Sequence, residues 1–180
     1  YNRIIVLRSW PEEAISELLS KRLEVAGFTA NYDELLNQMS SVAVGHHESV
    51  EQSDRNSDRF HRLIWDYADG NPRVALHFFR LALAPNPHHP TRVDVRLFPM
   101  PEAQALERFK QRTQFVLACL VQHENITPQE ACSSLRFAPH EVARSLELLH
   151  QEGFLVVDAG RYRVSAHWNR AVLRFLQRKK

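Results

Sequence analysis

The stretch TPQEACSSLRFAPHEVARSLELLHQEGFLVVDAGRYRV, residues 127–164, decides how the second half of the chain folds. Its first four residues place Thr and Glu three positions apart, the spacing of a capping box, which predicts a short helix over residues 128–135. A second helix is expected over residues 139–151, because apolar residues recur there every three to four positions and Gly153 follows as a stop signal.

The same stretch ends in a predicted β-hairpin. Residues 154–157 and 161–164 are rich in β-branched and aromatic side chains. The turn between them contains Asp158 and Gly160, and short hairpin loops prefer both residue types. A closing helix is expected to begin near Trp168 and to run to the end of the chain.

A long helix is expected to precede these elements, over about residues 102–123. Its buried face is expected to hold Leu106, Phe109, Phe115, Val116, Cys119 and Leu120. Three helices followed by a two-stranded wing is the order of a winged helix-turn-helix domain. We therefore expect residues 93–180 to form this domain, with residues 93–98 as a leading strand that pairs with the wing.

The first half of the chain opens with a short apolar run. Residues 3–7 are expected to form a buried strand, and its sheet would lie upstream of Tyr1, since one strand is not stable alone. Ser9 and Glu12 then have the spacing of another capping box, which predicts a helix that ends at Gly27. A chain that begins with Tyr rather than Met is expected to be part of a longer protein.

Three further helices are expected before the prolines that follow residue 84. One covers residues 32–39, and the polar residues 45–58 are expected to form a loop because they lack a periodic apolar face. The next helix ends at Gly70, and Asn71-Pro72 opens the last one, with Asn as N-cap and Pro at the first helical position. The buried faces of these two helices are expected to hold Phe60, Leu63, Ile64, Tyr67, Ala75, Phe78, Phe79 and Ala82. Residues 9–83 are thus predicted to be a small four-helix bundle.

Composition and charge indicate an ordinary globular chain made of two parts. The 180 residues are 44% hydrophobic and 24% charged, and no apolar run is long enough for a membrane span. Three prolines within residues 84–90 predict a stiff linker over residues 84–92. Residues 1–104 carry 11 basic and 14 acidic side chains, a net of −3, whereas residues 105–180 carry 12 and 7, a net of +5. This change of sign suggests two units with different partners.

The sequence Gly70-Asn71-Pro72-Arg73, followed by Val74-Ala75-Leu76, resembles the second-sensor motif of AAA+ ATPases. It is similar to the GNPR-x-A-L form of initiator-like and STAND-like members, in which the arginine projects from a helical lid toward the nucleotide phosphates. The resemblance implies that residues 1–83 are the last core strand and the lid, and that Arg73, Asn71 and Gly70 sense nucleotide. The fold is then mainly α, a helical lid bundle followed by a winged helix with a short β-hairpin.

The chain is not expected to be an enzyme by itself. It has no G-x-x-x-x-G-K-[ST] loop and no acidic pair to hold magnesium, so the resemblance implies that ATP and Mg²⁺ bind to an ATPase core upstream in the same chain. No nucleophile or acid–base pair stands out. A metal site is not expected either, because no CxxC or H-E-x-x-H occurs. Two isolated cysteines and no signal peptide indicate a reducing compartment, the cytoplasm, while a membrane-anchored parent protein stays open.

The winged helix offers basic side chains to duplex DNA. Its third helix would enter the major groove, with the wing on the backbone beside it. Arg161 and Arg163 alternate with Tyr162, so both arginines share one face of a strand. The candidate DNA contacts are His140, Arg144, Arg161, Arg163, Arg170 and Arg174. Glu141 and Glu147 oppose this interpretation on the third helix.

Two alternative hypotheses stay open at this point. In the first, the winged helix serves protein interaction, oligomerisation or autoinhibition, and its partner is a protein or a second copy of the chain. In the second, the chain is a stand-alone winged-helix regulator without an ATPase, and residues 9–83 are a dimerisation or ligand-binding bundle. A phosphate loop encoded upstream of Tyr1 would exclude the second hypothesis.

Overall fold

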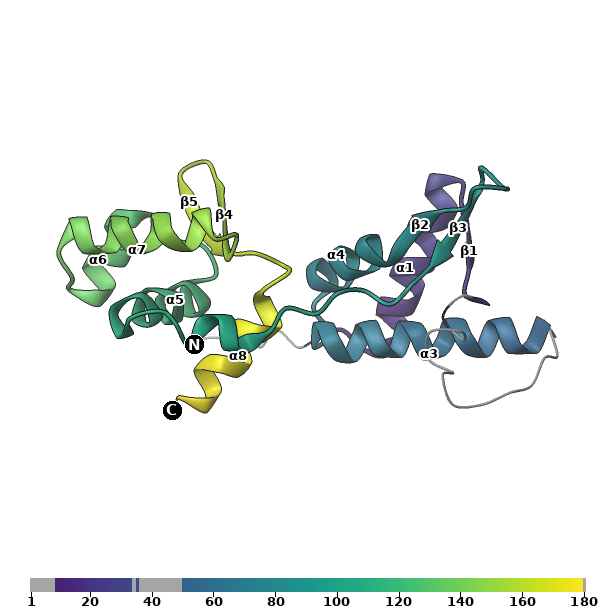
Figure 1. The fold of residues 1–180 in the computed structure, drawn as a ribbon, viewed down its shortest axis with the longest axis horizontal. Coiled ribbons are helices and arrows are strands. Elements are labelled where there is room, and N and C mark those ends of the chain that lie inside the picture. Colours follow the sequence, from purple (N-terminus) through teal and green to yellow (C-terminus); the bar gives the residue numbers. More distant parts are fainter. Residues whose placement is uncertain (1–8, 34, 36–49, 180) are drawn as a thin grey trace, which may run out of the picture. The chain divides into compact units, whose positions relative to one another are not determined.

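The computed structural model describes residues 9–33, 35 and 50–179. The chain divides into two compact units, residues 1–99 and 100–180. Each unit is mainly helical and contains one small β-sheet (Figure 1). The helices in the described part of the chain lack the length and apolar character that crossing a membrane requires. The strand expected over residues 3–7 and most of the helix expected over residues 32–39 lie outside the described residues.

The first unit is built on three described helices that pack against one another. These are α1 (Glu12–Ala26), α3 (Val50–Ala68) and α4 (Pro72–Ala82). Their shared core includes Ile15, Leu19, Phe60, Ile64, Phe78 and Phe79. The apolar faces predicted for the last two helices are therefore confirmed at most positions. The first helix ends at Gly27 as expected, with φ 73°.

A three-stranded sheet, which was not predicted from the sequence, completes the first unit. The central strand β3 (Arg92–Val95) runs parallel to β1 (Thr29–Asn31) and antiparallel to β2 (Leu83–Pro85). The residues expected to be a linker, 84–92, thus begin in β2, connect it to β3 and belong to the first unit. Proline fits here because β2 is an edge strand, where a missing N–H breaks no ladder bond. The leading strand expected over 93–98 is part of β3 and pairs with β1 and β2, not with the wing.

Two further predictions for the first unit are wrong. Residues 50–58 belong to α3 rather than to a loop, because the buried face of this helix continues toward its N-terminus through a polar residue, Asn56, which is 6% exposed. The capping box at Ser9 does not form: α1 begins one residue after Pro11, and no side chain caps it.

From residue 100 on, the second unit has the order of helices and hairpin that the sequence predicts, without the leading strand and with the first helix divided. A 3₁₀ turn and two helices are followed by a third helix, a hairpin and a closing helix (Figure 1). The elements are η1 (Ala103–Leu106), α5 (Gln111–His123), α6 (Pro128–Leu135), α7 (Pro139–Gln151), β4 (Leu155–Asp158), β5 (Arg161–Val164) and α8 (Asn169–Arg178). The Thr127–Glu130 capping box is present in full. β4 and β5 pair antiparallel, and Ile126 forms a bridge to Tyr162.

The long helix expected over residues 102–123 is interrupted. It consists of η1 and α5, and the residues between them allow Leu106 and Phe109 to enter the core together. Phe115, expected in that core, is 49% exposed and packs edge-on against Phe137. Val142, Leu146 and Leu149 are buried on α7 as predicted.

Candidate functional site

The turn between α3 and α4 holds the residues of the GNPR motif together. Gly70 has φ 66°, in the left-handed region that glycine adopts without strain. The side-chain oxygen of Asn71 accepts hydrogen bonds from the backbone N–H of Arg73 (3.0 Å) and of Val74 (3.3 Å). Asn71 is therefore the N-cap that the sequence predicts, and Arg73 lies in the first turn of α4 with an exposed side chain.

The same turn packs against the first described residues of the chain. The backbone N–H of Trp10 donates to the carbonyl oxygen of Gly70 (3.0 Å), and the indole Nε1 of Trp65 donates to the carbonyl oxygen of Trp10 (2.9 Å). A Cβ on Gly70 would lie 2.6 Å from that Trp10 oxygen and 2.7 Å from the Cβ of Ser9. The contact between Trp10, Trp65 and the turn was not predicted, because no local pattern links residues 55 positions apart.

On the second unit, α7 presents His140 and Arg144 to solvent, as expected. One of its two acidic residues, Glu141, pairs with Arg112 of α5. The other, Glu147, is exposed and accepts a hydrogen bond from Gln151 of the same helix. Just after the helix, Arg108 pairs with Glu152 at 2.6 Å. The exposed surface of α7 therefore keeps one of the two acidic side chains that oppose DNA binding.

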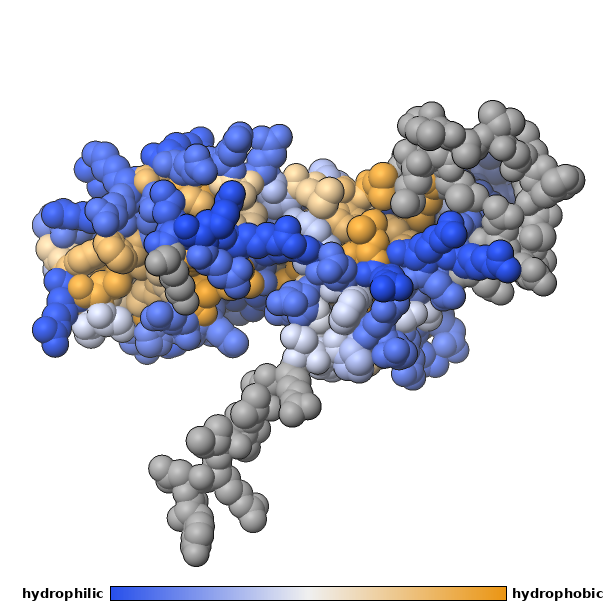
Figure 2. Space-filling model, turned by 90° about the horizontal axis from the view of Figure 1, so that it is seen from below, coloured by the Kyte–Doolittle hydropathy of each residue, from blue (hydrophilic) through white to orange (hydrophobic). Residues whose placement is uncertain are grey.

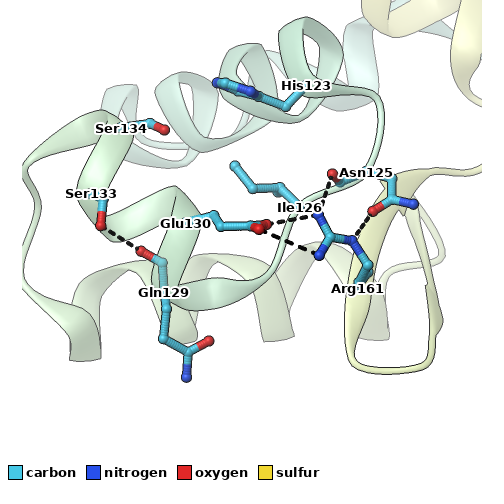
Figure 3. Close-up of a pocket in the computed structure, with 8 residues that line it drawn as sticks. All are labelled: His123, Asn125, Ile126, Gln129, Glu130, Ser133, Ser134 and Arg161. Carbon is cyan, nitrogen blue, oxygen red and sulfur yellow. Dashed lines mark hydrogen bonds and ion pairs between the residues drawn. The ribbon is translucent and has the colours of Figure 1, made fainter.

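Arg161 is held in place by side chains of its own unit (Figure 3). Its guanidinium donates to Glu130 at 2.8 Å, to the side-chain oxygen of Asn125, and to the Asn125 backbone oxygen at 3.2 Å. The pKa of Glu130 is lowered, first by the backbone N–H of Thr127 and further by Arg161. These groups line a pocket between α6 and β5 that also contains His123, Ile126, Gln129, Ser133 and Ser134. Arg161 thus ties the hairpin to the start of α6.

The remaining predicted arginines lie on separate elements. Arg163 is half-buried on β5, and no described residue accepts a hydrogen bond from its buried Nε. Arg170 is half-buried and Arg174 exposed on α8, which packs on η1 and α5. The hairpin packs on α5 and α7 instead. The arginines of β5 and those of α8 therefore lie on separate elements and do not share one face of a helix or strand.

Apolar side chains are exposed beside the hairpin. Leu148 on α7 and Val156 and Val157 on β4 are each 37–40% exposed, and α7 contacts β4. Figure 2 shows the face of the second unit opposite to the hairpin, where hydrophilic residues lie around apolar areas. Val156 and Val157 are consecutive on β4 and therefore point to opposite faces of the hairpin. Sequence reasoning missed the exposure of these three residues, since they look like ordinary core positions.

The thiols and histidines of the described residues form no site. Cys119 is buried, which raises the pKa of its thiol, and Cys132 is half-buried; neither is in a disulfide. No three metal-ligating side chains come together within the described ranges. His88 and His89 are exposed, and the side-chain oxygen of Asn86 accepts their backbone N–H groups, while His46 and His47 lie outside the described residues. The chain matches no family model, and no curated protein or solved structure matches it.

Proposed function

We propose that this chain is the non-catalytic regulatory part of a cytoplasmic AAA+-like ATPase. The first unit is the lid, the second unit is a winged helix, and ATP with Mg²⁺ binds to a core that precedes them in the same protein. Arg73 senses the nucleotide, and the second unit passes that state to duplex DNA.

One observation carries the nucleotide-sensing role. The turn that bears Arg73 is hydrogen-bonded to Trp10, near the point where residues 1–8 lead into the lid. We infer that the ATPase core, which would precede these residues in the chain, contacts this turn. The planar guanidinium offers paired donors to phosphate oxygens, and a triphosphate offers more of them than a diphosphate. Arg73 would therefore bind the ATP state more strongly and favour closure of the lid.

The test of this role uses the whole protein with its ATPase core. Replacing Arg73 with Ala should weaken ATP binding on the order of tenfold or more, the loss expected for a charge-assisted hydrogen bond, and should weaken ADP binding much less. Arg80, an exposed arginine in the last turn of the same helix, is the matched control. If the Arg73→Ala protein binds ATP as tightly as the Arg80→Ala protein does, and likewise ADP, the sensor role of Arg73 is refuted.

Several features of the second unit support a DNA-binding winged helix. Three helices precede a hairpin, and the Ile126–Tyr162 bridge ties that hairpin to the segment before α6. The exposed part of α7 carries His140 and Arg144, while one of its two acids, Glu141, is paired with Arg112 outside the helix. In this arrangement α7 enters the major groove and Arg163 contacts the backbone beside it.

Salt dependence tests this interface. Affinity for a random duplex should fall steeply as salt rises, because each phosphate contact releases counterions. Arg144→Ala and Arg163→Ala should each reduce the slope of log K against log salt by about 0.9 if each removes one contact. Arg161→Ala should change the slope least, because Glu130 and Asn125 already hold that guanidinium.

A protein partner for the winged helix is the second candidate, and the exposed Leu148, Val156 and Val157 favour it. Apolar residues at this position suit a protein surface better than a phosphate backbone. No binding to duplex even at low salt, together with self-association that Leu148→Asp abolishes in sedimentation, would favour this candidate over DNA.

A further inference from the structure

We propose that Trp65 is a positioning residue for Arg73. Its indole fixes the backbone of Trp10, and Trp10 in turn holds the Gly70–Arg73 turn in one place. This inference rests on the proposed nucleotide-sensing function and adds a residue to that site which lies outside the motif.

Three hydrogen bonds form a closed ring within the first unit. The Nε1–H of Trp65 donates to the carbonyl of Trp10 (2.9 Å), and the N–H of Trp10 donates to the carbonyl of Gly70 (3.0 Å). The N–H of Gly70 donates back to the carbonyl of Trp65 (3.3 Å). The ring joins the last turns of α3, the residues before α1 and the turn before α4. A displacement of Trp10 would therefore also displace the turn that carries Arg73.

Close packing reinforces this ring at Gly70. Gly27 and Gly70 have nearly the same backbone angle, φ 73° and 66°. Nothing lies within 4 Å of a Cβ built on Gly27, whereas a Cβ on Gly70 would meet three atoms of Ser9 and Trp10 at 2.6–2.9 Å. Gly27 is thus required only for its backbone angle, while Gly70 is also required for the close approach of Trp10. Gly27→Ala is therefore the matched control for Gly70→Ala.

Trp10 is 44% exposed, so burial of apolar area does not account for its place beside the turn. The backbone of Trp10 makes the hydrogen bonds instead. Trp65 supplies the only side-chain donor of the ring, and it also packs against the core of the unit. Trp65→Phe therefore removes the donor and keeps most of the packing.

The experiment compares four variants of the whole protein, including the proposed ATPase core: Trp65→Phe, Gly70→Ala, Gly27→Ala and Arg73→Ala. Each is titrated with fluorescent ATP and ADP analogues, and the ratio of the two affinities is the readout. Trp65→Phe should lower that ratio about threefold to tenfold, as loss of one hydrogen bond predicts. Gly70→Ala should lower it further. Gly27→Ala should lower thermal stability and leave the ratio unchanged, because strain at Gly27 does not reach the turn. Hydrogen exchange at the Trp10 amide should become faster in Trp65→Phe.

The outcomes separate this inference from the function on which it rests. An unchanged ratio in Trp65→Phe, with a lowered ratio in Arg73→Ala, would overturn the positioning role and leave the sensor intact. An unchanged ratio in Arg73→Ala would overturn both. If Gly27→Ala lowers the ratio of ATP to ADP affinity as much as Trp65→Phe does, any loss of stability changes the ratio. That result would also overturn the positioning role. If Gly70→Ala does not fold, Trp65→Phe still decides the question.

Discussion

Both units have ion pairs at the surface, but the first unit alone among the described residues also buries a carboxylate and a histidine. Asp94, 5% exposed, accepts hydrogen bonds from the amides of Asn31 and Asn86, and His61, 3% exposed, lies between the hydroxyls of Ser16 and Tyr32. The second unit keeps its ion pairs near the surface. Buried groups become costly once a partner is removed, whereas surface pairs contribute little and weaken with salt. Asp94 and His61 are therefore expected to matter for the stability of the first unit, whereas the surface pairs of the second unit mainly determine which arginines can reach a partner.

Removing Asp94 is expected to have the largest effect. Asp94→Ala leaves two half-buried amides without their shared, buried acceptor, in a sheet where Asp94 lies on the central strand. We expect a loss of about 2–3 kcal/mol in the free energy of unfolding, measured by urea denaturation. Asp94→Asn should cost much less, because one amide oxygen can accept from both Asn31 and Asn86, as Oδ1 does now.

Asp158 provides the control for this comparison. It is an exposed carboxylate at the end of a strand in the second unit, and Asp158→Ala is expected to change stability by less than about 0.5 kcal/mol. Equal losses for the two Asp→Ala variants would mean that burial of Asp94 does not matter.

Buried histidine makes stability depend on pH. Burial lowers the pKa of His61, partly offset by the nearby Asp58 carboxylate, and partial burial lowers the pKa of His167 in the second unit. The unfolded chain therefore binds more protons than the folded chain below the ordinary histidine pKa of about 6.5, and the free energy of unfolding falls as pH drops through that region. We expect His61→Gln to be less stable than the parent at pH 7.5 and to lose less stability between pH 7.5 and 5.5.

His167→Gln is the comparison that sharpens this prediction. His167 is only half-buried, so it should account for a smaller part of the pH dependence than His61 does. Urea denaturation at the two pH values measures both variants. If the pH dependence of the free energy of unfolding decreases more in His167→Gln than in His61→Gln, the main pH-sensitive histidine is His167 of the second unit, and this prediction is wrong.

The parts of the fold that follow local rules could be predicted from the sequence. The hairpin, α6, α7 and the cap at Asn71 each depend on residues within a few positions of one another. The sheet of the first unit could not be predicted this way, because β1 and β3 pair residues 63 positions apart and their short strands carry no strong pattern. The polar Asn56 on a buried face concealed the first turns of α3 for a similar reason.

For the candidate site too, the sequence predicts the features that depend on neighbouring residues and not those that depend on tertiary contacts. The motif turn and the exposed His140 and Arg144 lie where the sequence predicts. The sequence could not show that Arg161 has an acidic partner on another element, nor that Trp65 reaches the backbone of Trp10. Both facts depend on tertiary contacts between residues more than 30 positions apart.

Of the two predicted capping boxes, only the one in the second unit forms. Thr127 accepts from the backbone N–H of Glu130 at 3.2 Å, whereas no side chain caps α1 near Ser9. Thr127→Ala is therefore expected to cost about 1 kcal/mol, and Ser9→Ala close to nothing. Thermal denaturation measures both. A comparable loss in Ser9→Ala would indicate a cap at the start of α1 that forms in solution.

A small effect on stability is also expected for Arg161. Its pair with Glu130 is exposed, with side chains 40% and 51% accessible, so Arg161→Ala should lower the melting temperature slightly at low salt and even less at high salt. Its structural effect should be local: without the guanidinium, hydrogen exchange should increase in the hairpin and at the start of α6 but not in α7. Arg163→Ala, two residues along the same strand, should leave exchange at α6 unchanged and should reduce the salt dependence of DNA binding instead. If Arg161→Ala weakens DNA binding more than Arg163→Ala does while exchange at α6 stays the same, Arg161 contacts DNA directly and the ion pair is not what fixes its role.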